Sequence, residues 1–375
     1  MQSGIKLSLF VGPVPIPAPT EVVQALTSAT VEAGDGDTQS GFELTFELPA
    51  RSPLRTLFLL SGGGAVPPLM RVVLVVQIGG RTESIIDGMV TNVETRPGEG
   101  GVGQLVVKGK DLSALMDIIE LNGVPYPAMP PAVRVLIVLA KYAALGVIPL
   151  VIPSVVEDVP IPVDRIPLHR GTDYAYVKQL AMACGYVFYL EPGPVPGTSK
   201  AYWGPEIRVG EAQPALTVNM DAKSNVEELN FNFEKEKKTT PIVFFQEPNS
   251  KVAIGLPIPD VTPLNPPLGL VPPLPPKLTN LDNTAHMSPL SALMTGLAYA
   301  SQHSDSVFGS GRLDVARYGR LLKSRQLVGV RGAGLPFNGL YYVKKVTHDI
   351  KRGEYKQSFK LARNGLVSTV PTVPV

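Results

Sequence analysis

The segment 338-NGLYYVKKVTHDIKRGEYKQSFKLARNGL-366 predicts two β-strands joined by a glycine-containing turn. Apolar and polar residues alternate along its second half, Tyr355, Phe359 and Leu361 against Lys356, Ser358 and Lys360. This alternation is typical of a strand with one buried and one solvent-facing side. His348 is then expected to be a strand residue with a hydrogen-bonding partner. We interpret the segment as scaffold rather than as an active site.

An earlier segment, 87-DGMVTNVETRPGEGGVGQLVVKGKDL-112, repeats this pattern. Both segments open with Asp-Gly or Asn-Gly and end in a basic-acidic or basic-amide pair, Lys110-Asp111 or Arg363-Asn364. One constant spacing relates three positions of the first to three of the second: Val90, Val93 and Gln104 to Val343, Val346 and Gln357. Two unrelated hairpins of similar composition remain an alternative. If the repeat is genuine, the chain holds two related β-domains, the second one split by an insertion.

The composition indicates a folded, β-rich protein. Of the 375 residues, 44% are apolar and 18% are charged, which suits a globular chain and argues against general disorder. The counts of 36 glycines and 38 prolines are more informative. Proline, at about twice its usual share of ~5%, does not fit inside long helices. A chain of this length has room for two or three domains.

The charge and the single cysteine exclude several classes of protein. A net charge of +2 and a pI near 8.5 are too balanced for a protein that holds nucleic acid along a basic face. Cys184 alone cannot form an internal disulfide or a metal site of several cysteines. The N-terminal sequence lacks the long apolar core of a signal peptide. We predict no cofactor and no specific nucleic-acid binding.

The run Val133–Val156 is the most membrane-like part of the sequence. Arg134 and Lys141 interrupt its beginning, and Pro149 and Pro153 interrupt its end. The uncharged remainder is shorter than the ~20 residues that a spanning helix needs. We therefore predict a buried core segment and no membrane insertion.

Local patterns predict the order of strands and helices. Strands are expected at Phe42–Leu48, Arg71–Ile78, Met89–Thr95 and Gln104–Lys108. One helix is predicted to begin at Pro131 and to end near Gly146, and another to run from a cap at Thr172 to Gly185. The apolar face of the second helix comprises Tyr174, Val177, Leu180, Ala181 and Cys184, so this cysteine is expected in a core.

The stretch 256-LPIPDVTPLNPPLGLVPPLPPKL-278 is so rich in proline that an extended, largely polyproline II conformation is predicted. Its PxxP spacings, Pro263 to Pro266 and Pro272 to Pro275, could be offered to an SH3-like groove. A stiff connector along the surface is the simpler interpretation. A helix through Leu290, Leu293 and Leu297 is predicted after it.

The sequence contains no catalytic or binding motif in the structural context that such a site requires. The glycines of 98-GEGGVG-103 fit a dinucleotide pattern, but a strand follows where a helix N-terminus should bind pyrophosphate. The four histidines lack the spacing of paired metal ligands, and no serine lies in a GxSxG motif. Ordinary carboxylates such as Asp87, Glu94, Asp111 and Asp173 do not indicate a catalytic pair. We predict that the protein is not an enzyme.

Three segments carry a family resemblance: 170-RGTDYAYVKQLAMACGYVFYL-190, 317-RYGRLLKSRQLVGVRGAG-334 and 337-FNGLYYVKKVTHDIKRGEYKQSFKLARNGL-366. Together they resemble the phage late control D family, the baseplate hub proteins of contractile phage tails and contractile injection systems. The stretch 105-LVVKGKDLSALM-116 is similar to the first barrel of that family, and Pro257–Lys277 lies outside the resemblance. The hub part of VgrG-type proteins is similar as well.

The resemblance implies a β-rich α+β fold, with two tail-tube-like β-barrel domains, the second discontinuous, and an inserted α/β domain. It implies a homotrimer that adapts a hexameric inner tube, or a tube-initiator protein, to a three-fold spike within a baseplate. The implied place of assembly is the bacterial cytoplasm. VgrG-type proteins carry their spike behind the hub, so here the spike is expected to be a separate polypeptide. The family has no catalytic residues to transfer.

The predicted divisions are a first barrel at 1–117, an inserted α/β domain at 118–205, the two parts of the second barrel at 206–245 and 311–366, a proline-rich insertion with a helix at 246–310, and a tail at 367–375. Residues expected to shape the barrel hairpins and the helix core are Val90, Val93, Gln104, Tyr174, Leu180, Cys184, Gly339, Val343, Val346 and Phe359. A β-rich glycan-binding module or cell-wall hydrolase is the alternative. Its aromatic groove is not evident, because the sole tryptophan, Trp203, is expected in a glycine-proline loop.

Overall fold

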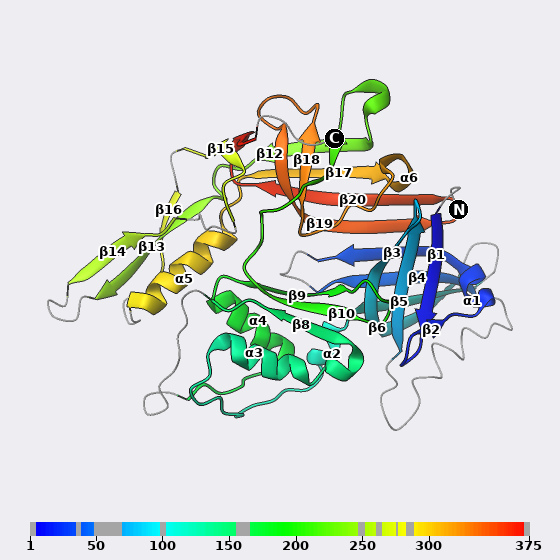
Figure 1. The fold of residues 1–375 in the computed structure, drawn as a ribbon, viewed down its shortest axis with the longest axis horizontal. Helices are drawn as coiled ribbons and strands as arrows, with labels where there is room; N and C mark the ends of the chain where they lie inside the picture. The colour runs from blue at the N-terminus through cyan, green and yellow to red at the C-terminus, as the bar shows by residue number, and fades with distance from the viewer. Residues whose placement is uncertain are drawn as a thin grey trace.

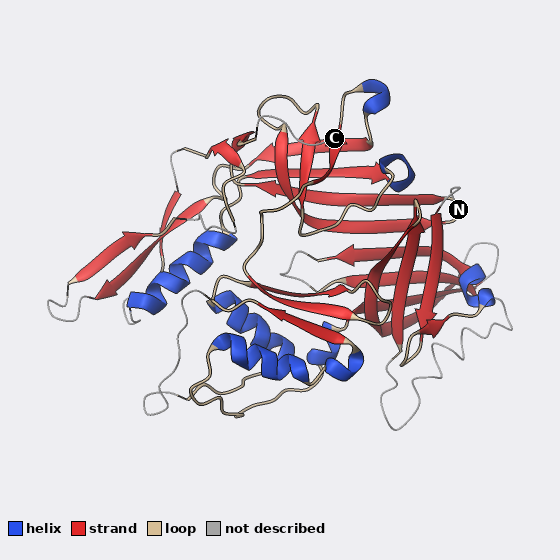
Figure 2. Ribbon diagram, viewed as in Figure 1, coloured by secondary structure: helices blue, strands red, loops and turns tan. Residues whose placement is uncertain are grey.

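The computed structural model describes residues 5–34, 39–48, 70–97, 103–154, 166–246, 252–259, 265–274, 277–282 and 289–370. A large β-sheet dominates these ranges, with an α/β unit beneath it and a projecting β-arm with its helix at one side (Figure 1). Helices are confined mainly to the α/β unit and the arm (Figure 2). This β-rich architecture agrees with the fold class predicted from the glycine and proline content.

Within the described ranges the large sheet has thirteen strands, in the order β12-β17-β20-β19-β3-β4-β7-β6-β5-β1-β2, with β18 beside β19 and β11 beside β18. The N-terminal strands are β1 (Ile5–Val11), β2 (Ile16–Pro17), β3 (Leu26–Ala33), β4 (Gly41–Leu48), β5 (Arg71–Ile78), β6 (Arg81–Pro97) and β7 (Gly103–Asp111). The C-terminal strands are β11 (Gln213–Thr217), β12 (Val226–Phe233), β17 (Val307–Asp314), β18 (Leu327–Arg331), β19 (Gly339–Lys351) and β20 (Glu354–Arg363). Short helices α1 (Thr20–Ala25) and α6 (Val315–Tyr318) and the 3-10 turn η4 (Asp221–Lys223) connect them.

One hydrophobic core serves both halves of this sheet. Leu44 and Leu105 from the first half belong to the same buried cluster as Tyr341, Val343 and Phe359 from the second. The alternation predicted for the last hairpin is confirmed, because Tyr355, Phe359 and Leu361 are buried while Lys360 is exposed. The described strands form a continuous sheet, and closure of each half into a barrel stays a prediction.

The α/β unit contains α2 (Ser113–Met116), α3 (Pro131–Ala140), η3 (Ala143–Leu145), β8 (Val147–Val151), α4 (Asp173–Ala183), β9 (Val187–Pro192) and β10 (Ser199–Gly204). Its three strands lie in the order β8-β10-β9. Both predicted helices occur, although α3 ends at Ala140 and only a 3-10 turn follows before Gly146. The Thr172 hydroxyl accepts a hydrogen bond from the Ala175 N–H at 3.1 Å. The buried face of α4 comprises Tyr176, Val177 and Ala181, whereas Tyr174, Leu180 and Cys184 are half-buried against the same core.

One sequence prediction about this unit is wrong, and another holds only in part. Trp203 lies in the strand β10, not in a loop, and its side chain is 0% exposed. The run from Val133 is only partly buried, because α3 exposes Val133, Leu136 and Ile137 on its outer side. An amphipathic pattern needs polar residues to mark the outer face of a helix, and here both faces are apolar. No helix in the described ranges is long and apolar enough to span a membrane.

The β-arm consists of β13 (Thr239–Gln246), β14 (Ala253–Pro257) and β16 (Lys277–Asn280), packed against α5 (Pro289–Gln302). The predicted proline-rich connector is therefore paired in part, and β15 (Gly269–Val271) also pairs, with β21 (Leu366–Ser368). Pro263 and Pro275 of the PxxP spacings lie outside the described residues. β13 pairs with the arm strands, and β17 begins at residue 307. The division of the chain into domains stays a prediction.

Candidate assembly interface

The two halves of the large sheet have the same strand order. Apart from the two-residue strand β2, which pairs only with β1 among the described strands, the first half contributes β1, β3, β4, β5, β6 and β7 in chain order. The second half contributes β11, β12, β17, β18, β19 and β20. Their spatial orders are β3-β4-β7-β6-β5-β1 and β12-β17-β20-β19-β18-β11, which is the same permutation. The halves differ in the last pair, which is antiparallel for β1–β5 and parallel for β11–β18. A shared order of six strands supports the internal repeat.

The two predicted hairpins, β6–β7 and β19–β20, are bulged at equivalent positions. The register shifts between Val90 and Asn92 in the first hairpin and between Val343 and Lys345 in the second. Bulges re-aim side chains and are designed features of a strand pair rather than random defects. The spacing between the valines of the sequence repeat therefore has a counterpart in the backbone.

The glutamine part of the predicted repeat is wrong by one residue. Gln104 lies opposite Arg96, whereas Gln357 lies opposite His348, the counterpart of Thr95. Gln357 is accordingly buried and hydrogen-bonded to backbone atoms of a neighbouring loop, while Gln104 is half-buried. A shift of one residue moves a side chain to the opposite face of a sheet, and the hairpins have connections of different length.

The junction between the halves is the antiparallel pair β3–β19. Val31 lies opposite His348 and Ala29 opposite Ile350, and all four side chains are buried. On the outer side, Glu32 forms an ion pair with the ammonium group of Lys345. The halves are thus joined by main-chain hydrogen bonds, by core packing and by charge.

His348 gives this junction a pH dependence. Burial lowers its pKa from 6.5 to about 4, and its Nδ1 atom lies 2.7 Å from the Tyr355 hydroxyl. Below pH 6.5 the unfolded chain takes up a proton that the folded chain excludes until about pH 4. We expect the free energy of unfolding to fall by about 3 kcal/mol more between pH 7 and pH 4 than in a His348→Gln variant. Urea titrations at both pH values measure this, and equal losses in both proteins would contradict it.

Two strand edges lack the partner that their counterparts have, among the strands that the structure describes. β12 corresponds to β3, but it pairs only with β17. β6 corresponds to β19, but its part from Val93 to Pro97 pairs only with β7. The side chains of Phe231 and Phe233 on β12 are only partly buried, whereas Val31, the counterpart of Phe231 on β3, is fully buried.

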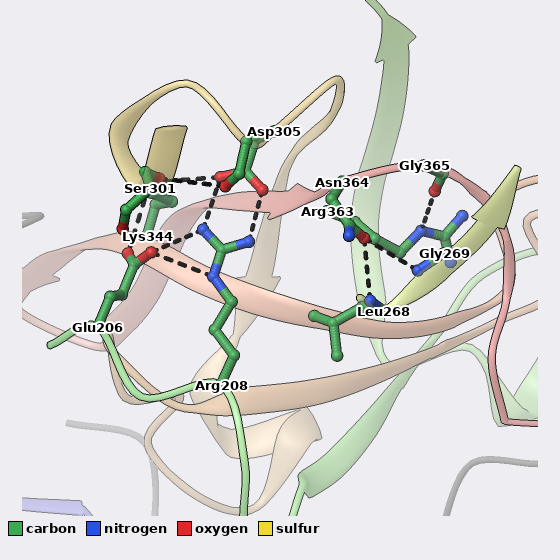
Figure 3. Close-up of polar contacts among 11 residues, drawn as sticks. Glu206, Arg208, Leu268, Gly269, Ser301, Asp305, Lys344, Arg363, Asn364 and Gly365 are labelled. Atoms are coloured by element: carbon green, nitrogen blue, oxygen red, sulfur yellow. Dashed lines mark hydrogen bonds and ion pairs between the residues drawn. The ribbon is translucent and has the colours of Figure 1, made fainter. Parts of the chain in front are cut away.

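A buried ion cluster joins the linker after β10, the loop between α5 and β17, and the strand β19 (Figure 3). The Arg208 guanidinium donates to Asp305 at 2.5 and 2.8 Å and to Glu206 at 2.7 and 3.1 Å. Lys344, the residue within the β19 bulge, lies 3.5 Å from Glu206 and 3.4 Å from Asp305. Arg208, Glu206 and Asp305 are all at least nine-tenths buried. The cluster therefore balances two buried carboxylates with two cations.

Mutual charge keeps these groups ionised. Burial alone would raise the pKa of Asp305, but Arg208 and Lys344 hold this pKa well below its usual range. Burial would likewise lower the pKa of Arg208, and Asp305 and Glu206 raise it well above its usual value instead. A neutral, fully paired cluster of this kind is a structural joint rather than a catalytic acid-base pair.

The end of β20 is hydrogen-bonded to the loop before β19 and to β15. Arg363 is fully buried and donates to the carbonyl oxygens of Gly365, Asn338 and Pro336 at 2.7, 3.0 and 2.7 Å. The Asn364 side-chain oxygen accepts the N–H groups of residues 268 and 269 at 2.9 and 3.0 Å (Figure 3). The basic-amide pair noticed in the sequence thus closes the β15–β21 contact.

Most residues predicted to shape the barrel hairpins lie against the core, whereas no prediction pointed to the ion cluster. Val90, Val93, Val343, Val346 and Phe359 all pack on the common core. Gly339 has a φ of +120°, and a side chain there would meet Ser368. Glu206, Arg208 and Asp305 carried no sequence signal, because their pairing spans the whole insertion. Within the described residues, no group of three or more histidine, cysteine or acidic side chains could hold a metal ion.

Comparison with solved structures identifies the fold. A tail protein from Neisseria meningitidis MC58 superposes with a TM-score of 0.63 at 12% identity, covering 97% of this chain and 98% of that protein. The 43 kDa tail protein of prophage MuSo2 from Shewanella oneidensis gives 0.62 at 12% identity, covering 96% and 98%. The chain has the fold of phage tail proteins. No protein-family model matches it, and no curated protein matches it in sequence.

The E. coli c3393 protein shares this fold, with a TM-score of 0.53 at 11% identity over 93% of this chain and 75% of that protein. That protein is a component of the type VI secretion system and is structurally similar to the T4 bacteriophage tail proteins gp27 and gp5. The same architecture thus occurs in phage tails and in a bacterial secretion apparatus.

Proposed function

We propose that this protein is the structural baseplate hub of a contractile phage tail or injection system, a homotrimer that adapts the six-fold inner tube to the three-fold central spike. The observation that carries the proposal is the six-strand order that occurs twice in one chain. Three copies of a chain with two equivalent units present six equivalent units in a ring. Such a ring matches a hexameric tube on one side and a trimeric spike on the other.

The comparisons support this role, since two neighbours are tail proteins and a third belongs to a type VI secretion system. The proposed partners are a second and a third copy, a spike protein, the inner tube or a tube initiator, and other baseplate proteins. The proposed place of assembly is the bacterial cytoplasm. The glycan-binding alternative is less well supported, because Trp203 is buried and does not line a surface groove.

Light scattering tests the proposal with the full chain, alone and mixed with its proposed spike protein. We expect a mass of three times 40.0 kDa, in the free protein or after the spike is added. A chain that stays monomeric at high concentration and ignores the spike would contradict the hub. Glycan and hydrolase screens would then be the next measurements.

A further inference from the structure

We infer that β12 of one copy pairs antiparallel with the Val93–Pro97 part of β6 in the next copy, so that the large sheet runs from chain to chain. The inference rests on the proposed trimer and goes further by assigning the two edges that meet and their register. It names a second copy of this chain as the occupant of both open edges.

The contact already exists once within the chain. β3 and β19 pair where the two halves meet, and β12 and β6 are their counterparts in the other half. The same relation between halves, applied once more, places the β12 edge of one copy against the β6 edge of another. These are the two edges that lack this partner among the described strands, and an open strand edge is a ready template for another chain.

The repeated bulges fix the register. β3–β4 shifts between Leu26 and Ser28, and β12–β17 shifts between Val226 and Glu228, so Leu26 is equivalent to Val226. The β6 and β19 bulges make Val90 equivalent to Val343. The match of Leu26 with Val226 makes Asn232 and Asn230 the counterparts of Glu32 and Thr30. The match of Val90 with Val343 makes Glu94 and Arg96 the counterparts of Thr347 and Asp349. The pairs Glu32–Thr347 and Thr30–Asp349 observed within the chain therefore predict two pairs between copies. The predicted pairs are Asn232–Glu94 and Asn230–Arg96.

The side chains suit this register. It places Phe233 beside Val93 and Phe231 beside Thr95, on the side of the sheet that holds the core. Thr95 is exposed, although Leu105 opposite it on β7 is fully buried and its counterpart His348 is only 6% exposed. Pairing would therefore cover apolar surface that is buried at the equivalent junction inside the chain.

The outer face and the strand end are compatible as well. Glu94 and Arg96 face asparagines, so no like charges meet. Pro97 has no N–H to donate, which ends the ladder at that point. The two edges are different surfaces of the chain, so the contact is head-to-tail, and such contacts form a ring when the rotation closes.

Engineered disulfides test the register directly. In a Cys184→Ser background, Glu94→Cys with Asn232→Cys should link neighbouring copies when the protein is oxidised. The matched control is Thr347→Cys with Glu32→Cys, the equivalent pair within one chain. Directly opposite residues with close Cα atoms lie within the span of a disulfide. We expect covalent trimers on a non-reducing denaturing gel for the first pair, and monomers with an internal disulfide for the control.

The outcomes separate this inference from the proposed function. A trimer by light scattering that does not cross-link, while the control disulfide forms, overturns the register and leaves the hub standing. A chain that is monomeric alone and with its spike overturns both. Cross-linking of Glu94→Cys with Phe233→Cys, on opposite faces in this register, in place of the Asn232 pair would also overturn it.

A proline variant provides a second readout. Val90 donates its N–H to the Met70 carbonyl, at the edge of β6 that faces away from β7. Thr95 lies on the same face of the sheet as Val90, so its N–H points to the same edge. Thr95→Pro removes this donor and leaves the β6–β7 ladder intact, so the protein should fold but lose the trimer. Thr95→Ala is the control and should stay trimeric. A fully trimeric Thr95→Pro protein would contradict the edge pairing.

Discussion

Arg208→Ala is expected to lower the free energy of unfolding by about 3–5 kcal/mol. The substitution leaves Glu206 and Asp305 buried with only Lys344, whose side chain is 31% exposed, to balance them. Breaking a buried ion pair costs more than its formation contributes, because the remaining charge stays out of water without a partner. Urea unfolding followed by the fluorescence of the single Trp203, which is buried in the native state, measures the loss.

An exposed ion pair in the same protein provides the control. Lys200 lies 2.8 Å from Glu191, and both side chains are about a third or more exposed, so Lys200→Ala should cost only ~0–1 kcal/mol. A second readout is pH. Unpaired buried carboxylates bind protons more readily than in the unfolded chain, so the Arg208→Ala protein should recover stability relative to the wild type as pH falls. An equal loss in both variants at pH 7 would show that the cluster is not a joint.

Trp203→Ala is expected to cost about 3–5 kcal/mol, the range for removing a large aromatic side chain from a core. The indole is 0% exposed, packs edge-on against Tyr186 at 4.9 Å between ring centres, and donates its N–H to the Val177 carbonyl at 3.3 Å. The vacated volume lies between β10 and α4, where neither element can close the gap alone. Circular dichroism replaces fluorescence as the probe, because the variant has no tryptophan.

Val195→Ala is the control for that variant, since Val195 belongs to the same α/β unit and is 60% exposed. Its effect should stay within about ±0.5 kcal/mol. The trimer of the folded Trp203→Ala protein should be unchanged, because the strand edges that carry the proposed contact lie in the large sheet. A loss below ~1 kcal/mol for Trp203→Ala would mean that the unit repacks around the vacancy.

Much of the local structure was predictable from short patterns. The period-two alternation predicted the hairpin from residue 338 onward, and Pro131 and Thr172 marked the beginnings of the helices α3 and α4. These signals are local, because a cap or an alternating strand depends on residues a few positions apart. The spacing of the valine pairs even indicated the internal repeat, through two bulged hairpins far apart in the chain.

Other features depended on the tertiary structure. The buried location of Trp203 depends on the pairing of its strand β10 with β9. The exposed face of α3 could not be recognised in the sequence, because its residues are apolar like those of the buried face. The alignment of Gln104 with Gln357 failed because turn length, which composition does not reveal, decides the face of every residue in a strand.

The sequence by itself determined the β-rich character, the helix starts and the repeated valine spacing, because each is encoded in neighbouring residues. The tertiary structure alone decided that Arg208 meets Asp305 and that β3 joins β19. It also decided that β12 and part of β6 have an open edge among the described strands. Those contacts join residues far apart in the sequence. Their formation depends on how whole strands are ordered in the sheet, and no short pattern encodes that order.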